Sequence, residues 1–195
     1  KEAHRDYWRR VLAADFHFRP RKATRHFTPG EVIDLGTCTA EVIHAPGHTP
    51  GFTVFYFREP QVLYLGDYDL TAFGPWYGDR DSSIEDTIAS LQRLRKIPAK
   101  VWLTSHEDGC FEDDATEAFD RYLAVIGARE AKLLEFLSAP RTMEDIVAAC
   151  LVYRKPREPK AFFEWGEGAI MGKHIERLLR SGAIAFGDGR YRRLP

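Results

Sequence analysis

The sequence has few cysteines and no cysteine pair. Cys38, Cys110 and Cys150 lie far apart in a chain of 195 residues, and no CxxC motif is present. Their odd number and wide spacing argue against a disulfide framework and against a thiolate metal site. We therefore expect the protein to work in a reducing compartment.

Long hydrophobic runs and an excess of one charge are also absent. No apolar run approaches the roughly 18 to 20 residues that a membrane-spanning helix needs, and the first residues are charged rather than signal-like. The formal net charge is −1, so the whole molecule has no field that would recruit nucleic acid or a membrane. These absences predict a cytoplasmic protein without a membrane partner.

The content of 44% hydrophobic residues supports a sizeable core, and the patterning predicts an α+β fold. An amphipathic helix is expected over residues 2–14. Four strands are expected next, because short alternating or dense apolar runs are bounded by Gly and Pro. These strands cover residues 31–36, 39–46, 52–57 and 62–66. A helix over 82–97 with Ser82 and Glu85 in capping-box register, a short strand over 99–106 and a long helix from Asp113 or Asp114 follow.

The pattern changes near residue 129, where we place the boundary between a first domain, residues 1–128, and a C-terminal module, residues 129–195. The module begins with a helix, followed by helical segments over 142–150 and 168–182, and ends in a hairpin. Asp188 and Gly189 form a two-residue turn signal in that hairpin. Three helices followed by a two-stranded wing predict a winged helix-turn-helix module.

Three separate segments finish a strand with a good metal ligand. These ligands are His48 in "APGHTPG", Asp67 in "YLGDYD" and His106 in "LTSHEDG". Imidazole nitrogen and carboxylate oxygen suit zinc, and also iron or manganese, and ligands from separate strand ends can converge on one edge of a sheet. Each residue alone is weak evidence, because a single His or Asp at a strand end is more often an ordinary turn residue.

Taken in order, the segments resemble the metallo-β-lactamase superfamily of metal-dependent hydrolases, which has an αββα sandwich fold. "EVIHAPGHTPGFTVF" is similar to its third metal motif, "VLYLGDYDL" to its Asp motif and "VWLTSHEDG" to its closing Gly-His-Gly motif. The resemblance implies that His48, Asp67 and His106 are metal ligands, with Asp67 as the catalytic bridge between two ions, most simply zinc. It also implies that Tyr68, Trp76 and Tyr77, in or beside the loop after the Asp motif, contact substrate; simple packing is the alternative.

The family's first motif, His-x-His-x-Asp-His, is not found in these residues. We expect it to precede Lys1, so that this chain is the second half of the fold, or a truncated form of it. The alternative is a natural, degenerate member with a weakened metal site. Either way, His48, Asp67 and His106 leave an incomplete coordination shell, and the 195 residues alone are expected to bind metal poorly.

The resemblance favours a hydrolase of small-molecule esters, thioesters or lactones that uses a metal-activated water. A second hypothesis is an RNA-processing phosphodiesterase, because the C-terminal segment resembles winged-helix extensions in this superfamily and carries Arg190, Arg192 and Arg193. A third is a metal-poor binding module. Nucleic acid is therefore an open but disfavoured partner, and a homodimer also stays open.

Overall fold

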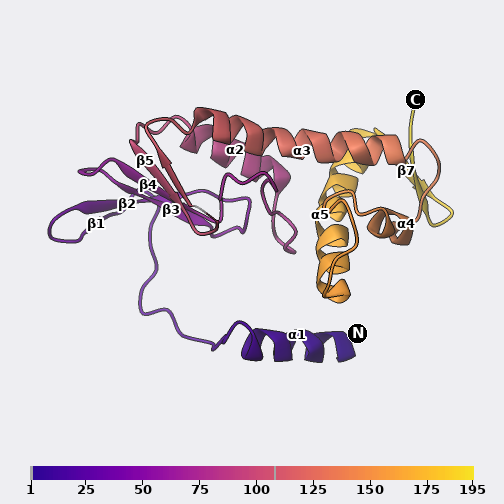
Figure 1. Cartoon of the computed structure of the whole chain (residues 1–195), viewed down its shortest axis with the longest axis horizontal. Helices are drawn as coiled ribbons and strands as arrows, with labels where there is room; N and C mark the ends of the chain where they lie inside the picture. Colours follow the sequence, from indigo (N-terminus) through magenta and orange to yellow (C-terminus); the bar gives the residue numbers. More distant parts are fainter. Residues whose placement is uncertain (1, 108) are drawn as a thin grey trace.

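The computed structural model describes residues 2–107 and 109–195, which form a sheet-based region joined by a long helix to a helical region (Figure 1). In chain order the elements are α1 (Glu2–Ala14), β1 (Val32–Asp34), β2 (Thr39–His44), β3 (Thr53–Phe57), β4 (Val62–Gly66), α2 (Ile84–Leu94), β5 (Val101–Thr104), β6 (Cys110–Glu112), α3 (Thr116–Phe136), α4 (Met143–Ala148), α5 (Lys160–Ser181), β7 (Ile184–Gly187) and β8 (Arg190–Arg193).

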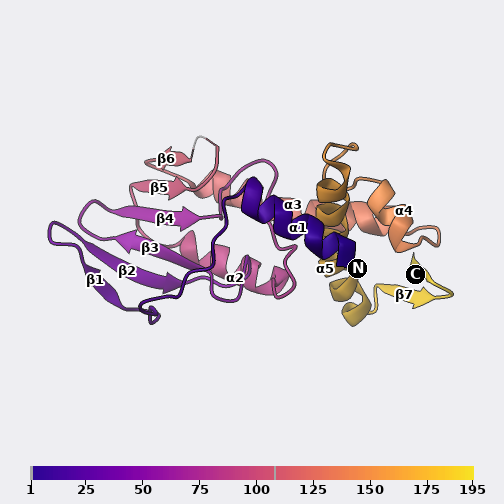
Figure 2. The ribbon, with the colours of Figure 1, turned by 90° about the horizontal axis from the view of Figure 1, so that it is seen from below.

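The large sheet has the strand order β1-β2-β3-β4-β5-β6 (Figure 2). Neighbouring strands are antiparallel except β4 and β5, which are parallel. A parallel pair needs a crossover connection, which α2 supplies. Since β2 also runs in the direction of β4, the carboxyl ends of β2, β4 and β5 reach the same edge of the sheet, where the three predicted ligands follow them.

Helices α2 and the first half of α3 cover one face of the sheet, because alternate strand residues point toward them. Leu63 and Leu65 of β4 are fully buried there, beneath Leu91 and Leu94 of α2. Strand alternation puts Phe55 and Tyr64 on the opposite face, where they are only partly buried. Of the predicted αββα sandwich, the described residues thus supply one large sheet with helices on one of its faces.

Helix α3 connects two hydrophobic cores. Phe119 and Tyr122 pack in the core of the sheet region, whereas Ile126 and Leu133 pack in a second core with α4 and α5. The predicted boundary at residue 128 falls inside this helix, which continues unbroken to Phe136. The division into two domains therefore stays a prediction.

Several element bounds differ from those predicted. Helix α2 is capped by Ser83, whose hydroxyl accepts a hydrogen bond from the Asp86 amide, so the cap lies one residue later than the Ser82 and Glu85 pattern indicated. Helix α3 begins at Thr116 rather than at Asp113 or Asp114. Strand β6 was not predicted, because its three residues are too few to show a pattern.

The C-terminal region has the expected helices and hairpin. Helix α5 begins at Lys160, eight residues before the start predicted from its apolar spacing, and β7 pairs with β8. Asp188 and Gly189 both have positive φ values, 51° and 73°, as a type I′ hairpin turn requires. The winged helix-turn-helix assignment of this region stays a prediction.

The N-terminal helix is confirmed over the predicted residues and lies against α5 (Figures 1 and 2). The ring centroid of Trp8 in α1 is 5.4 Å from that of Trp165 in α5. Among the helices that the structure describes, none combines the length and apolar composition needed to cross a membrane.

Candidate metal centre

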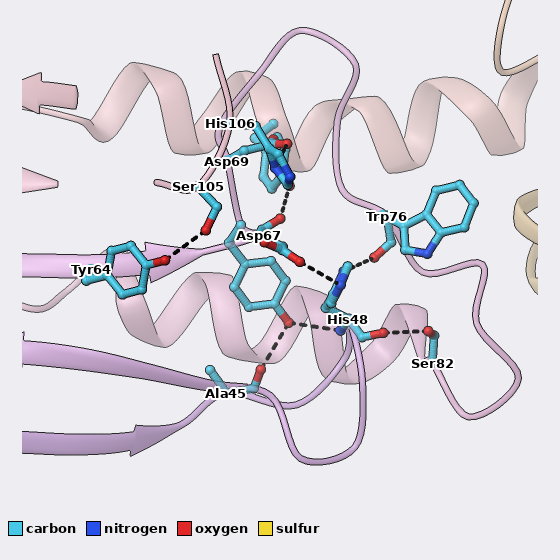
Figure 3. Close-up of polar contacts among 11 residues, drawn as sticks. Ala45, His48, Tyr64, Asp67, Asp69, Trp76, Ser82, Ser105 and His106 are labelled. Atoms are coloured by element: carbon cyan, nitrogen blue, oxygen red, sulfur yellow. Dashed lines mark hydrogen bonds and ion pairs between the residues drawn. The ribbon is translucent and has the colours of Figure 1, made fainter. Parts of the chain in front are cut away.

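The predicted ligands gather at the sheet edge where β2, β4 and β5 end (Figure 3). His48 lies in the loop between β2 and β3, Asp67 directly follows β4, and His106 follows β5. The amide of Ser105 donates a hydrogen bond to the Gly66 carbonyl oxygen at 3.0 Å, which fixes the two loop starts side by side. Parallel pairing of β4 and β5 therefore brings together residues that lie 39 positions apart in the sequence.

The loop that carries His48 is held tightly against α2. Gly47 has a φ of +134°, and a Cβ atom at this position would lie 2.4 Å from the Thr87 amide nitrogen. Glycine is therefore required here by both its backbone conformation and the close approach of the helix. Every carbonyl oxygen from Ala45 to His48 accepts a hydrogen bond. The donors are the hydroxyl of Tyr68 for Ala45, the hydroxyls of Tyr68 and Ser90 for Pro46, the amide of Ser83 for Gly47, and the hydroxyl of Ser82 for His48.

The imidazole of His48 is oriented through both of its nitrogens. Nδ1 lies 3.2 Å from the carbonyl oxygen of Trp76. A carbonyl oxygen only accepts, so Nδ1 carries the proton and donates it. In the neutral ring, Nε2 is then the unprotonated nitrogen, and it lies 3.2 Å from Oδ2 of Asp67. An imidazole lone pair and a carboxylate thus face the same small region, as metal ligands do.

A second histidine and aspartate pair lies beside the first. Nδ1 of His106 is 3.4 Å from Oδ2 of Asp69, and the other oxygen of Asp69 accepts hydrogen bonds from the amide and hydroxyl of Thr71. The side chain of His106 is 56% exposed, whereas that of Asp69 is 17% exposed. Asp69 is therefore the fixed member of this pair, and His106 faces solvent.

A buried tyrosine supports the start of the loop after β4. The hydroxyl of Tyr122, in α3, donates to the backbone carbonyl oxygen of Asp67 at 3.3 Å. Burial, together with the negative charge of Asp69, raises the pKa of Tyr122 well above its ordinary value. The phenol therefore stays neutral and remains a hydrogen-bond donor at this position.

Arg129, in α3, fixes the loop that orients His48. Its guanidinium is buried and donates to the carbonyl oxygens of Phe73 at 2.6 Å and Pro75 at 2.8 Å, and to the hydroxyl of Tyr77 at 3.1 Å. These contacts lie on both sides of Trp76, whose carbonyl accepts from His48. Arg129 is thus a positioning residue that acts on His48 through the backbone of this loop.

The three aromatic residues predicted to contact substrate have different surroundings. Tyr68 and Tyr77 are fully buried, and their hydroxyls bond to protein groups. This placement matches the packing alternative, so substrate contact by Tyr68 and Tyr77 stays a prediction that the burial does not favour. Trp76 is only partly buried, and its ring centroid is 5.5 Å from that of Trp165. His44, four residues before His48, contacts the Pro50 carbonyl oxygen through Nε2 at 2.7 Å.

The donor types fit a metal ion, but the set is incomplete. His48, Asp67 and His106 supply the imidazole and carboxylate groups that zinc and iron bind. Within residues 2–107 and 109–195, however, no three His, Cys, Asp or Glu side chains are close enough together to hold an ion. Two pairs, His48 with Asp67 and His106 with Asp69, are present instead. Shared coordination by the three predicted ligands therefore stays a prediction.

Comparison with known proteins shows the family and the fold of this chain. The family model described as "Metallo-beta-lactamase superfamily" matches residues 1–106, which include all four residues of the two pairs. This chain belongs to the metallo-β-lactamase superfamily. The fold agrees, since a crystal structure of a metallo-beta-lactamase family protein from Thermus thermophilus superposes with a TM-score of 0.76 at 23% identity, covering 98% of this chain and 64% of that chain.

The relatives of similar sequence include a hydroxyacylglutathione hydrolase and an acyl-coenzyme A thioesterase. A hydroxyacylglutathione hydrolase from Methylococcus capsulatus is 33% identical over 108 residues, which are 54% of this chain and 38% of the relative. An acyl-coenzyme A thioesterase from Gallus gallus is 33% identical over 94 residues, 46% of this chain and 31% of the relative. The matched part thus spans less than two fifths of either relative.

Sequence reasoning missed two side chains of this centre. Asp69 stands two positions after Asp67 in "GDYDL", and this repeated acidic residue in one loop was a usable signal. Arg129 gave no such signal, because it lies in a helix 53 residues after Trp76 and acts through backbone carbonyl oxygens. Contacts to backbone oxygens leave no trace in side-chain patterns.

Proposed function

We propose that this chain forms part of a metal-dependent hydrolase of thioesters, with His48 and Asp67 as metal ligands. The observation that carries the proposal is the pair of His48 Nε2 and Asp67 Oδ2, which face each other 3.2 Å apart at the sheet edge. Membership of the superfamily and the named activities of the relatives support the same chemistry. Since the chain matches only part of those relatives, the activity is assigned to the protein that contains it.

A bound zinc ion would supply an acidified water molecule and polarise the substrate carbonyl. The residues of this chain hold and orient the ligands. The Trp76 carbonyl keeps the proton on Nδ1 of His48, which leaves Nε2 free for the ion. Asp67 contributes a carboxylate, and His106 is expected to turn from Asp69 toward the ion, because its exposed ring has room to rotate. Asp69 would then remain as a hydrogen-bond acceptor beside the centre.

The proposal is tested by measuring thiol release from acyl thioesters by the metal-loaded protein. Asp67→Asn keeps the side-chain shape but removes the charge. We expect kcat/KM to fall by about 100-fold or more, because a proposed metal ligand is weakened. Asp81→Asn is the matched control, because Asp81 is exposed in the loop before α2. Equal activity of the two variants would refute the role of Asp67. No hydrolysis of any thioester by the metal-loaded unaltered protein would refute the function.

A further inference from the structure

A basic groove opens beside the candidate metal centre, between the sheet region and the helical region. It has a volume of about 480 Å³, and its polar and aromatic lining includes Phe73, Glu107, Arg129, Lys132, Arg154 and Arg157. Four of these six side chains are cationic and one is anionic. The groove is therefore a local exception in a chain whose formal net charge is only −1.

One end of the groove lies beside the candidate metal centre. Phe73 belongs to the loop that starts with Asp67 and Asp69, and Glu107 directly follows His106. From this end the groove passes along α3, which contributes Arg129 and Lys132, toward the segment between α4 and α5. A molecule whose reacting group lies at the centre can thus extend into the groove without crossing a strand.

Three of the four cations are available to a ligand. Arg129 is buried and bonded to the loop of Phe73 and Pro75, but Lys132, Arg154 and Arg157 are exposed. Within residues 2–107 and 109–195, no ion pair engages any of these three side chains. The guanidinium carbon of Arg157 lies 5.8 Å from the centroid of Phe163, a contact that orients it.

The distribution of charge along the groove limits what it can bind. Glu107 stands at the end next to His106 and repels anions there, whereas Arg154 and Arg157 come from the segment after α4. A suitable ligand is neutral near its reacting group and anionic farther away. Phosphate groups meet the second condition well, because each phosphate monoester carries about −1.5 to −2 charges and pairs with arginine through two parallel hydrogen bonds.

We propose that the basic groove binds the phosphate groups of the thiol carrier of the substrate. The carrier is a small nucleotide-containing thiol of the coenzyme A class, in which a neutral arm separates the thioester from several phosphates. This assignment rests on the proposed thioester hydrolysis for the position of the reacting group. It adds a site, formed by Lys132, Arg154 and Arg157, that the superfamily assignment does not contain.

The groove is tested first by direct binding, without any turnover. Free coenzyme A is titrated calorimetrically into the protein and into a variant with Lys132→Gln, Arg154→Gln and Arg157→Gln. We expect binding to weaken about 10- to 100-fold, as three exposed charge pairs are lost. A variant with Arg190→Gln, Arg192→Gln and Arg193→Gln has the same change in net charge on β8, away from the groove, and should bind as the unaltered protein does.

Equal weakening in the two triple variants would overturn the proposal, because it would show general attraction to a positive surface. Pantetheine, which has the neutral arm but no phosphate, serves as the reference ligand. Coenzyme A that binds the unaltered protein no better than pantetheine would also overturn the proposal.

Turnover then separates this inference from the proposed function. For the same acyl group, we expect the ratio of kcat/KM for the coenzyme A thioester to that for the pantetheine thioester to fall about 10- to 100-fold in the groove variant. An unchanged ratio in an enzyme that hydrolyses both thioesters would refute phosphate binding in the groove but not the proposed function. Binding of coenzyme A that depends on the groove, without hydrolysis of its thioester, would refute the proposed function but support the binding site.

Discussion

Arg129 is the residue whose replacement tests how the loop next to His48 is built. Arg129 is 4% exposed, and its guanidinium donates to two backbone carbonyl oxygens and to one phenol hydroxyl. Arg129→Met keeps an unbranched side chain but removes these donors, so the oxygens of Phe73 and Pro75 lose their partner. A buried acceptor left without a partner costs about 1 to 3 kcal/mol.

The expected loss of unfolding free energy in Arg129→Met is about 3 kcal/mol, since two carbonyl oxygens are affected and water relieves part of the cost. Urea unfolding followed by circular dichroism measures this loss. Arg121→Met is the matched control, because Arg121 is exposed on the same helix and pairs with exposed Glu117. That substitution should change the free energy by no more than about 0.5 kcal/mol.

The same variant should also weaken metal binding. With the loop loosened, the carbonyl of Trp76 no longer holds Nδ1 of His48, and loss of such an outer contact lowers metal affinity by about 10- to 100-fold. Competition with a chromophoric chelator gives the affinity of the folded variant. If Arg129→Met and Arg121→Met had the same stability and the same metal affinity, the positioning role of Arg129 would be wrong.

Two further predictions concern the loop at Gly47 and the buried histidine of α5. Gly47→Ala should lower the free energy of unfolding by about 1 to 3 kcal/mol, because alanine is strained at this φ and its Cβ meets Thr87. Thermal unfolding measures this loss, and Gly51→Ala is the control, since no atom lies near the Cβ added there. An equal loss of stability in both variants would contradict the argument. Burial lowers the pKa of His174, and the hydrogen bond between His174 and Glu130 lowers the pKa of Glu130. Both groups therefore take up protons more readily in the unfolded chain. Stability should therefore fall as the pH drops below about 6.5, the ordinary value for histidine. In His174→Gln the loss of stability just below pH 6.5 should be smaller, as measured by urea unfolding at a series of pH values. The same loss in this variant as in the unaltered protein would contradict the role given to His174.

The strand ends that carry the predicted ligands could be read from the sequence, because strand ends leave a strong signal. Runs such as "VLYLG" identified the strands, and the residues after them marked the edge where His48, Asp67 and His106 lie. The parallel pairing of β4 and β5 follows from the helix between them. Strong local patterns thus predicted most of the fold and the elements that carry the centre.

The remaining features depend on contacts between distant segments. The bond of His48 to the Trp76 carbonyl and the anchoring of that loop by Arg129 involve backbone oxygens, which no side-chain pattern reports. The basic groove combines residues from the loop after β4, from α3 and from the segment before α5. Its cations are scattered in the sequence, so only the packing of the two regions reveals that they share one surface.

The most direct test of the account is the metal content of two histidine variants of the protein that contains this chain. His48→Ala removes the imidazole that faces Asp67. His44→Ala removes another partly buried imidazole, which lies four residues before His48 and contacts the Pro50 carbonyl oxygen instead. Elemental analysis after equilibration with zinc should show that His48→Ala loses bound metal and that His44→Ala keeps it. Equal metal content in the two variants would contradict the assignment of His48 and Asp67 as the metal centre.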